Sequence, residues 1–142
     1  MSLNKIFDVT GSGMSSQSVR LNTVASNIAN ADSVSTSANT VYKARKPVFA
    51  ASMANMRAQN FGSTQEGVGV QVLGIVESDA PVQAKYLPDH PLADKDGMVY
   101  ESNVNIMEEM ADMISASRAY QMNIDVADNA KTLLLRTLSL GQ

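Results

Sequence analysis

The residues that most resemble a catalytic or metal-binding set lie in one short stretch, LPDHPLADKDG at 87–97. His90 is the only histidine of the chain, and Asp89, Asp94 and Asp96 lie close to it in sequence. An imidazole and carboxylates could bind a divalent metal, but a surface turn punctuated by prolines ordinarily has this composition. The piece DKDG begins like a calcium loop, yet the further ligands and the closing glutamate are missing at their offsets. We therefore interpret the stretch as a turn and predict no metal site.

The other patterns that could do chemistry are weaker. GVGVQV is a lone Gly-x-Gly inside an alternating stretch, with Val72 where a dinucleotide fingerprint needs its third glycine. Glu108 and Glu109 are adjacent on a predicted helix, so they point about 100° apart and do not form a catalytic pair. The chain has no cysteine, which excludes thiol chemistry and disulfides. We predict no catalytic residue and no cofactor, and hence not an enzyme.

Charge and hydropathy exclude two further classes of protein. The formal net charge is −3 and the pI is about 5.0, whereas nucleic-acid-binding domains usually carry a basic patch. The only basic cluster is Lys43, Arg45 and Lys46, which is either a solvated loop or a small phosphate or lipid contact. The apolar runs, such as Leu133 to Leu135, are far short of the roughly 20 residues that span a bilayer. We expect no nucleic-acid partner, no membrane insertion and no cleavable secretory signal in MSLNKIFDVTGSGM.

The long elements lie at the two ends of the sequence. Residues 3–31 are predicted to form a helix with a heptad seam. Gly11 and Gly13 weaken it, either because the first turns fray or because another backbone approaches closely. Residues 105–140 form the strongest predicted helix, with Asn103 or Asn105 as N-cap. The predicted seams comprise Phe7, Met14, Leu21, Val24, Ile28 and Ala31 in the first helix, and Ile106, Met110, Met113, Ser117, Tyr120, Ile124, Ala127, Lys131, Leu134 and Leu138 in the second.

Between the helices the hydrophobic period changes to two. GVGVQVLGIVES predicts a strand with an irregularity near Gly74, and PVQAKYLP and the piece Met98 to Glu101 predict two more. Residues 47–60 fit a helix or an extended segment equally well. The predicted fold is α+β and mainly α: long N- and C-terminal helices pair as an antiparallel coiled coil, and a small β-rich middle region joins them. The predicted division is 1–36 for the N-terminal axial helix, 37–104 for the linker and β-rich region, and 105–142 for the C-terminal axial helix.

Aromatic residues are scarce, with three Phe, four Tyr and no Trp. Large rings supply much of the burial in a compact core, so we expect a thin core. Ordering two long helices costs about 1 kcal/mol or more per residue, which seam burial offsets only in part. Backbone hydrogen bonds recover more of this cost, and the helix pair alone is expected to be marginally stable. We therefore expect the terminal arms to be loose until neighbouring subunits complete them.

Two long motifs resemble a known family. SSQSVRLNTVASNIANADS at 15–33 is similar to the N-terminal signature of the bacterial flagellar axial proteins, the family of rod and hook subunits. NVNIMEEMADMISASRAYQMNIDVADNAKTLLLRTLSLG at 103–141 is similar to their C-terminal signature. The wider family follows its Asn-x-Ala-Asn element with a short Thr-x-Gly-Tyr-Lys link. Here a longer link separates NIAN from Tyr42-Lys43 and no glycine precedes the tyrosine, which resembles the proximal rod subunits and argues against the distal rod and hook members.

The resemblance implies a building block of the flagellar rod, the drive shaft that crosses the bacterial periplasm. Its implied partners are copies of itself and other flagellar rod subunits, together with the basal-body ring proteins, the rod-base adaptor proteins and the flagellar export apparatus. The resemblance also implies export through the flagellar type III system without a cleavable signal, and terminal segments that are disordered in the free subunit.

Asparagines on several faces of both helices suggest subunit contacts, because neutral amides bond across buried interfaces without the desolvation cost of charges. The alternative is that Asn22, Asn27, Asn30, Asn123 and Asn129 are ordinary surface residues. A rival class is a helical adaptor or chaperone of a type III export system that does not polymerise; an enzyme is a distant third. The candidate subunit-interface residues are Leu21, Asn22, Val24, Asn27, Ile28, Asn30, Met110, Met113, Arg118, Tyr120, Ile124, Leu134 and Leu138.

Overall fold

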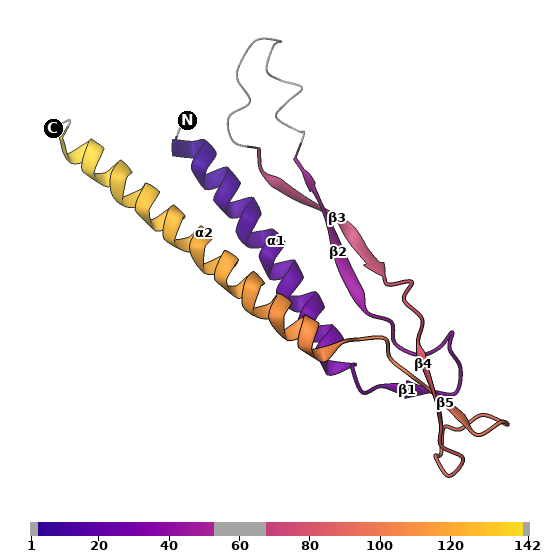
Figure 1. Ribbon diagram of the computed structural model, residues 1–142. Coiled ribbons are helices and arrows are strands. Elements are labelled where there is room, and N and C mark those ends of the chain that lie inside the picture. The colour runs from indigo at the N-terminus through magenta and orange to yellow at the C-terminus, as the bar shows by residue number, and fades with distance from the viewer. Residues whose placement is uncertain (1–2, 53–67, 141–142) are drawn as a thin grey trace. The chain divides into compact units, whose positions relative to one another are not determined.

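The computed structural model describes residues 3–52 and 68–140 of the 142-residue chain (Figure 1). The chain is α+β, as predicted, with a helix at each end of the element order and short strands between them. In chain order the elements are α1 (Leu3–Ala29), β1 (Val34–Ser35), β2 (Arg45–Ala51), β3 (Val70–Glu77), β4 (Gln83–Tyr86), β5 (Met98–Glu101) and α2 (Ile106–Leu140).

The chain divides into two compact units, each built from segments that are distant in sequence. The first unit contains Met1–Val19, Val48–Gly74 and Ser115–Gln142, and the second contains Arg20–Pro47 and Ile75–Ile114. Each helix therefore contributes one part to each unit. The predicted division at residues 36 and 104 follows the chain order and stays a prediction.

At the end of helix α1, asparagine and serine side chains donate hydrogen bonds to backbone carbonyls. The last four carbonyls of a helix have no partner within the helix. Here Asn30 Nδ2 donates to the Ser26 carbonyl at 2.8 Å, and just beyond the helix Ser33 Oγ donates to the Asn30 carbonyl at 2.7 Å. The observed end at Ala29 lies two residues before the predicted one, within the usual uncertainty of a helix boundary.

Helix α2 begins with an asparagine cap. Asn105 Oδ1 accepts hydrogen bonds from the backbone N–H of Met107 at 3.1 Å and of Glu108 at 3.4 Å. These are two of the donors that a helix start leaves without partners, so Asn105 is the N-cap. Glu108 and Glu109 lie in the first turn, where carboxylates complement the helix dipole. The choice between Asn103 and Asn105 is thereby settled in favour of Asn105.

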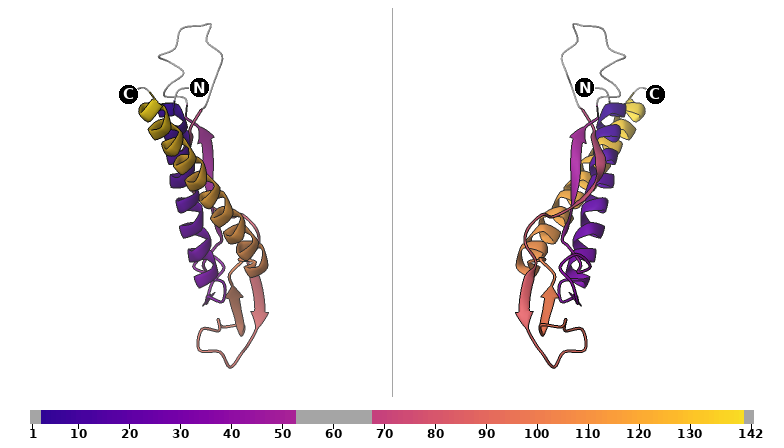
Figure 2. Two further views of the ribbon diagram at one scale, coloured as in Figure 1. Left: turned by 90° about the vertical axis from the view of Figure 1, so that its left-hand side faces the viewer. Right: turned by 90° about the vertical axis from the view of Figure 1, so that its right-hand side faces the viewer.

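The three-stranded antiparallel sheet of the second unit has the order β1–β5–β4. Strand β5 is central, and β4 lies beside it in both views of Figure 2. Lys85 pairs with Val99 and Ala84 with Tyr100. Val99 is completely buried, so the middle of the sheet also supplies the core of this unit.

Strands β2 and β3 form a separate two-stranded sheet. The Ser52 N–H donates to the Gly69 carbonyl at 2.7 Å, and the Ser78 N–H donates to the Ala44 carbonyl at 2.7 Å, so the pair runs antiparallel. Residues 47–51, which the sequence left open, belong to strand β2, while 53–60 lie outside the described residues. Strand β3 continues through Gly74, and the irregularity predicted near that residue stays a prediction.

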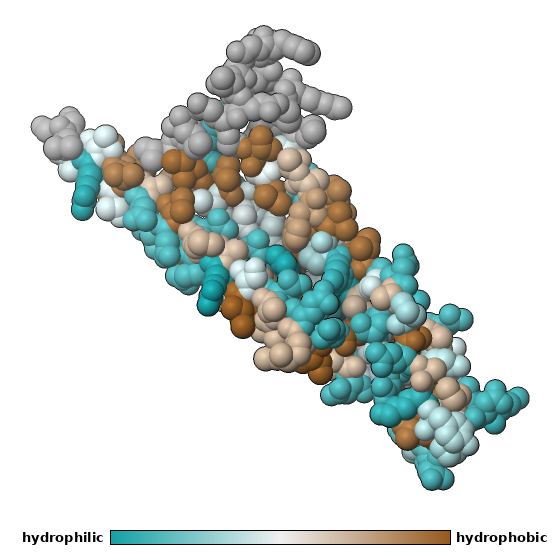
Figure 3. All heavy atoms as spheres, in the orientation of Figure 1, coloured by the Kyte–Doolittle hydropathy of each residue, from teal (hydrophilic) through white to brown (hydrophobic). Residues whose placement is uncertain are grey.

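The core is thin, as the composition predicted. Among the described residues, the buried apolar side chains are all valine or alanine, whereas many Leu, Ile and Met side chains are exposed. Brown apolar surface is visible beside teal polar surface on the face drawn in Figure 3. Alanine and valine remove little area from water, so the chain buries far less apolar surface than its composition offers. The buried apolar residues are Val24, Ala31, Val41, Ala44, Val99, Ala116 and Ala130.

Helix α1 buries hydroxyl side chains that bond to its own backbone. Thr10 Oγ1 donates to the Ile6 carbonyl at 2.8 Å, and Ser16 Oγ donates to the Ser12 carbonyl at 2.8 Å. A buried hydroxyl without a partner is costly, and bonding to the preceding turn removes this cost. The small polar face of α1 can therefore lie inside the protein.

The seam predicted for α2 has the wrong register. Its buried and half-buried residues follow Glu109, Met113, Ala116, Tyr120, Asn123, Ala127 and Ala130, a stripe that steps by four and three. Met113, Tyr120, Ile124 and Ala127 were predicted correctly, because all four are half-buried. Small residues hold the other inward positions and carry little hydropathy signal, so larger neighbours dominated the pattern. The predicted seam residues that are exposed are Ile106, Met110, Ser117, Lys131, Leu134 and Leu138.

Candidate functional site

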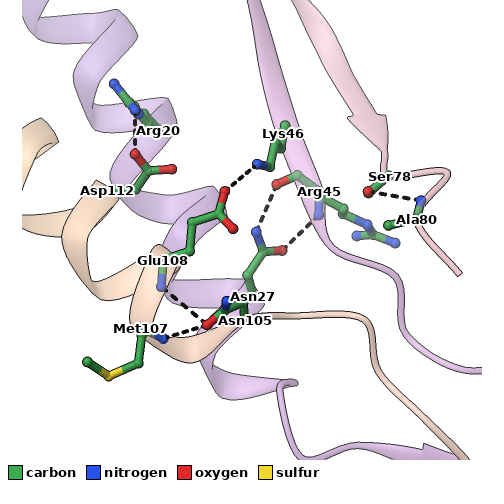
Figure 4. A network of polar contacts seen from close by, with 10 residues as sticks. All are labelled: Arg20, Asn27, Arg45, Lys46, Ser78, Ala80, Asn105, Met107, Glu108 and Asp112. Carbon is green, nitrogen blue, oxygen red and sulfur yellow. Dashed lines mark hydrogen bonds and ion pairs between the residues drawn. The ribbon is translucent and has the colours of Figure 1, made fainter. Parts of the chain in front are cut away.

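The best-connected polar group of the second unit is the side-chain amide of Asn27 (Figure 4). Its Nδ2 donates to the Arg45 carbonyl at 2.8 Å, and its Oδ1 accepts from the Arg45 N–H at 2.9 Å. The Tyr42 hydroxyl also donates to Oδ1, at 2.9 Å. Asn27 is 1% exposed, so these three bonds satisfy an amide that water does not reach.

Tyr42 and Arg45 also contact each other. The guanidinium carbon of Arg45 lies 5.4 Å from the centre of the Tyr42 ring, within the range of a cation–π interaction. The Tyr42 hydroxyl lies 3.2 Å from Ser26 Oγ. Asn27, Tyr42 and Arg45 thus form an interlocked group, which we call the amide latch; it joins the end of α1 to the start of β2.

Ion pairs lie beside the latch on helix α2. Lys46 Nζ is 3.1 Å from Glu108 Oε1, and Arg20 Nη2 is 2.7 Å from Asp112 Oδ1 (Figure 4). The hydrogen bond to Glu108 raises the pKa of Lys46, and the nearby carboxylates of Glu109 and Asp112 add to this effect. Lys46 and Glu108 are both more than half exposed, so the pair contributes less than about 1 kcal/mol to stability.

The small basic cluster is largely paired with carboxylates. Arg45 Nη2 lies 3.3 Å from Glu77 Oε1, and Lys46 pairs with Glu108. Lys43 is half-buried. Because two of the three cations already contact carboxylates of the same chain, the arrangement favours an ordinary structural role over a phosphate or lipid contact.

A second asparagine side chain, that of Asn103, joins two further segments of this unit through hydrogen bonds to Ala44 and Ala80. Its Oδ1 accepts from the Ala44 N–H at 2.7 Å, and its Nδ2 donates to the Ala80 carbonyl at 2.8 Å. The Ala80 N–H in turn donates to Ser78 Oγ at 3.3 Å (Figure 4). Two asparagines therefore fix both sides of the backbone that leads into strand β2.

The residues singled out for possible chemistry form turns. His90 Nδ1 accepts from the Leu92 N–H at 3.1 Å, and Asp94 Oδ1 accepts from the N–H groups of Asp96 and Met98 at 2.9 Å each. Gly97 has a φ of +74°, which favours glycine and closes the turn. Within residues 3–52 and 68–140, no group of three or more His, Asp or Glu side chains lies close enough to hold a metal ion.

The two glycines of α1 differ in their surroundings. A Cβ atom on Gly13 would lie 3.0 Å from Asn123 Nδ2 and 3.2 Å from its Cγ, whereas one on Gly11 would meet nothing within 4 Å. A neighbour therefore does approach Gly13 closely, but it is the Asn123 side chain and not the predicted backbone. Glycine at position 13 lets α1 lie close to α2 in the first unit.

The candidate subunit-interface residues differ in their exposure to solvent within the single chain. Val24 and Asn27 are buried; Leu21, Ile28, Asn30, Met113, Tyr120 and Ile124 are half-buried; Asn22, Met110, Arg118, Leu134 and Leu138 are exposed. A single chain does not test contacts between subunits, so the interface role stays a prediction. The amides of Asn27 and Asn30 bond within the chain, and this gives them a role that the sequence analysis did not assign.

Sequence reasoning missed Tyr42, Arg45 and Asn103 as members of the network. Tyr42 entered only through the resemblance of its motif, and Arg45 only as one residue of a basic cluster. The contacts join residues 15 to 59 positions apart. No periodic pattern reports such pairs, because periodicity describes only neighbours on one element.

Both ends of the chain match families of flagellar basal-body rod proteins, and full-length relatives narrow the family further. Residues 7–35 match the family described as "Flagella basal body rod protein", and residues 95–140 match "Flagellar basal body rod FlgEFG protein C-terminal". The flagellar basal-body rod proteins FlgC of Salmonella typhimurium and Yersinia enterocolitica are 44% and 46% identical to this chain, with complete coverage of both sequences. FlgC of Borreliella burgdorferi is 33% identical, covering all of this chain and 99% of its own length. The chain belongs to the FlgC family of flagellar basal-body rod proteins.

Proposed function

We propose that this chain is a structural subunit of the proximal rod of the bacterial flagellar basal body, where it assembles with other rod components and is required for flagellum-dependent motility. The observation that carries the proposal is the identity of 33–46% with FlgC proteins along the entire chain. The relatives are named as rod proteins, and their names assign them no enzymatic activity.

The distribution of apolar side chains supports assembly through the terminal helices. Helix α2 leaves Met107, Met122 and Leu133 at 77%, 61% and 59% exposure. Large exposed apolar surfaces on soluble proteins usually mark interaction sites. We infer that neighbouring subunits cover these side chains in the rod, together with the exposed interface candidates Met110, Leu134 and Leu138.

We infer that the terminal helices pair antiparallel along their lengths as a coiled coil. Gly13 lies against Asn123 in the first unit, and Arg20 pairs with Asp112 in the second. The residue number rises in α1 as it falls in α2, which is the order that antiparallel helices require. The many alanines of the buried stripe suit such a close contact.

Membership of this family suggests the location, the export route and the further partners of the subunit. We place the subunit in the part of the rod within the periplasm, delivered by the flagellar type III export system. Basal-body ring proteins, rod-base adaptor proteins and the export apparatus are its proposed further partners. No helix in the described part of the chain is long and apolar enough to cross a membrane.

The test is to delete the gene for this chain in its host and restore it with a tagged copy. We expect the deletion to abolish swimming in soft agar and the tagged copy to restore it. Isolated basal bodies should retain the tagged chain after washing with detergent and high salt. A chain that restores motility but is washed out of the basal bodies would favour the non-polymerising adaptor.

A further inference from the structure

The bonds between Asn27 and Arg45 reproduce those of a neighbouring β-strand. In an antiparallel sheet, two directly opposed residues can exchange both N–H···O=C bonds. The Asn27 side chain does the same with one residue, since it donates to the Arg45 carbonyl and accepts from the Arg45 N–H. A helix side chain therefore serves as the strand partner of the first residue of β2.

In the described part of the chain, strand β2 pairs with β3 on one side only, so the backbone groups of Arg45 on its other side need another partner. The Ala44 carbonyl accepts from the Ser78 N–H, on the side of strand β3. Backbone groups of successive strand residues point to alternate sides, so those of Arg45 point away from β3. Backbone groups shielded from water must find partners, and the Asn27 amide supplies both.

We propose that Asn27 is a positioning residue that fixes the register of β2 against the end of α1, with the Tyr42 hydroxyl as its third contact. By holding the Arg45 backbone, it places the side chains of Arg45 and Lys46 opposite Glu77 and Glu108. This role lies within one chain and does not need a neighbouring subunit. Its consequence for rod assembly rests on the proposed function.

The geometry selects asparagine among the polar side chains. Position 27 needs one oxygen that accepts from two donors and one N–H that donates to a carbonyl, at the reach of a short side chain. Ionised aspartate offers no donor, and its second oxygen would face the Arg45 carbonyl. Alanine would leave the Arg45 N–H and carbonyl without their partners.

This geometry gives Asn27→Asp a diagnostic pH dependence. Protonated aspartic acid regains an O–H donor for the Arg45 carbonyl, whereas the buried carboxylate is repelled by it. The folded-state pKa of the introduced carboxyl therefore lies above its unfolded value of about 3.9. Its stabilising contribution is complete below that value and is lost as the pH rises through the folded pKa.

Other charged and titratable groups lie around the latch, so the variant is compared with the native chain at each pH. The groups are Tyr42 in the link, Arg45 and Lys46 on β2, Glu77 on β3, and Glu108, Glu109 and Asp112 on α2. These groups occur in both the variant and the native chain, so the difference in stability between the two proteins at each pH arises from residue 27. Asn22→Asp on the same helix is the matched control, because Asn22 is exposed.

The experiment measures thermal unfolding of the purified full chain by circular dichroism between pH 4 and pH 8. We expect Asn27→Asp to lower the midpoint by about 5 °C or more at pH 7, and by much less at pH 4. We expect Asn22→Asp to show no such recovery. An Asn27→Asp deficit equal at both pH values, or no larger than that of Asn22→Asp at pH 7, would overturn the proposal.

A second variant covers the case in which Asn27→Asp fails to fold at every pH. Tyr42→Phe removes one hydroxyl and keeps the ring beneath Arg45. We expect hydrogen exchange of the Arg45 amide, followed by NMR, to accelerate on the order of five-fold. Unchanged exchange would overturn the proposal. Both measurements use the isolated chain, so their failure is distinguishable from absence of the chain from basal bodies.

Discussion

Asparagine amides in this chain take the place of backbone groups. Asn27 serves as a strand partner of Arg45, Asn30 donates to a carbonyl at the end of α1, and Asn105 accepts at the start of α2. The sequence showed that asparagines lie on several faces of both helices, but not where their partners lie. The hypothesis of amide contacts between subunits remains a prediction for Asn22, which is exposed.

Gly11 and Gly13 give a matched pair of substitutions at the residue scale. Alanine is preferred to glycine inside a helix by about 1 kcal/mol. We expect Gly11→Ala to raise the free energy of unfolding by roughly that amount, because its Cβ meets nothing within 4 Å. Gly13→Ala should gain less or lose stability, because its Cβ would lie 3.0 Å from the Asn123 amide. Urea unfolding of the isolated chain measures both.

The Asn123 side chain provides the control for this pair. Asn123→Ala removes the crowding atoms, so Gly13→Ala should recover a gain close to that of Gly11→Ala in this background. Equal gains from the two alanine substitutions in the native background would contradict close packing at Gly13.

At the scale of elements, the sequence predicted the existence and type of both helices and of strands β3, β4 and β5. It misplaced the inward stripe of α2, because Ala116 and Ala130 carry little hydropathy signal while exposed Met110 and Leu134 carry much. Strand β2 stayed ambiguous because its apolar residues fit a helix or an extended segment, while its hydrogen-bond partners, β3 and Asn27, lie elsewhere in the chain. Local propensity cannot report a partner that lies elsewhere in the chain.

The close contact between Gly13 and Asn123 predicts that cysteines introduced at these two positions form a disulfide between the terminal helices. The double variant Gly13→Cys and Asn123→Cys should crosslink on mild oxidation, because its Cβ atoms fall near the roughly 3.5–4.5 Å that a disulfide needs. The absence of native cysteine removes background pairs. Mobility on non-reducing gels measures the intrachain bond.

The control for this crosslink is Gly11→Cys with Asn123→Cys. A Cβ at position 11 meets nothing within 4 Å, so this pair should remain reduced. Comparable crosslinking of the two pairs would mean that the helices have no fixed register. Crosslinking of the Gly13 pair in basal bodies but not in the free chain would mean that assembly completes the pairing.

At the scale of the whole molecule, the chain keeps alanine, valine and hydroxyl residues inside and leaves larger apolar residues outside. Burial of a leucine or methionine side chain contributes about 1.5–3 kcal/mol, so the exposed residues hold much unused stabilisation. The composition predicted this thin core, since it contains few aromatic residues. The proposal that other rod components cover this outer surface rests on the family and not on the residue pattern.

The most direct test of the central claim is thiol labelling at exposed residues of α2. Single Met110→Cys and Leu138→Cys variants should react readily with a maleimide in the free chain, where the native residues are 50% and 62% exposed. We expect both thiols to become protected in isolated basal bodies from motile cells. Equal labelling in the free chain and in basal bodies would contradict a rod subunit that assembles through these helix surfaces.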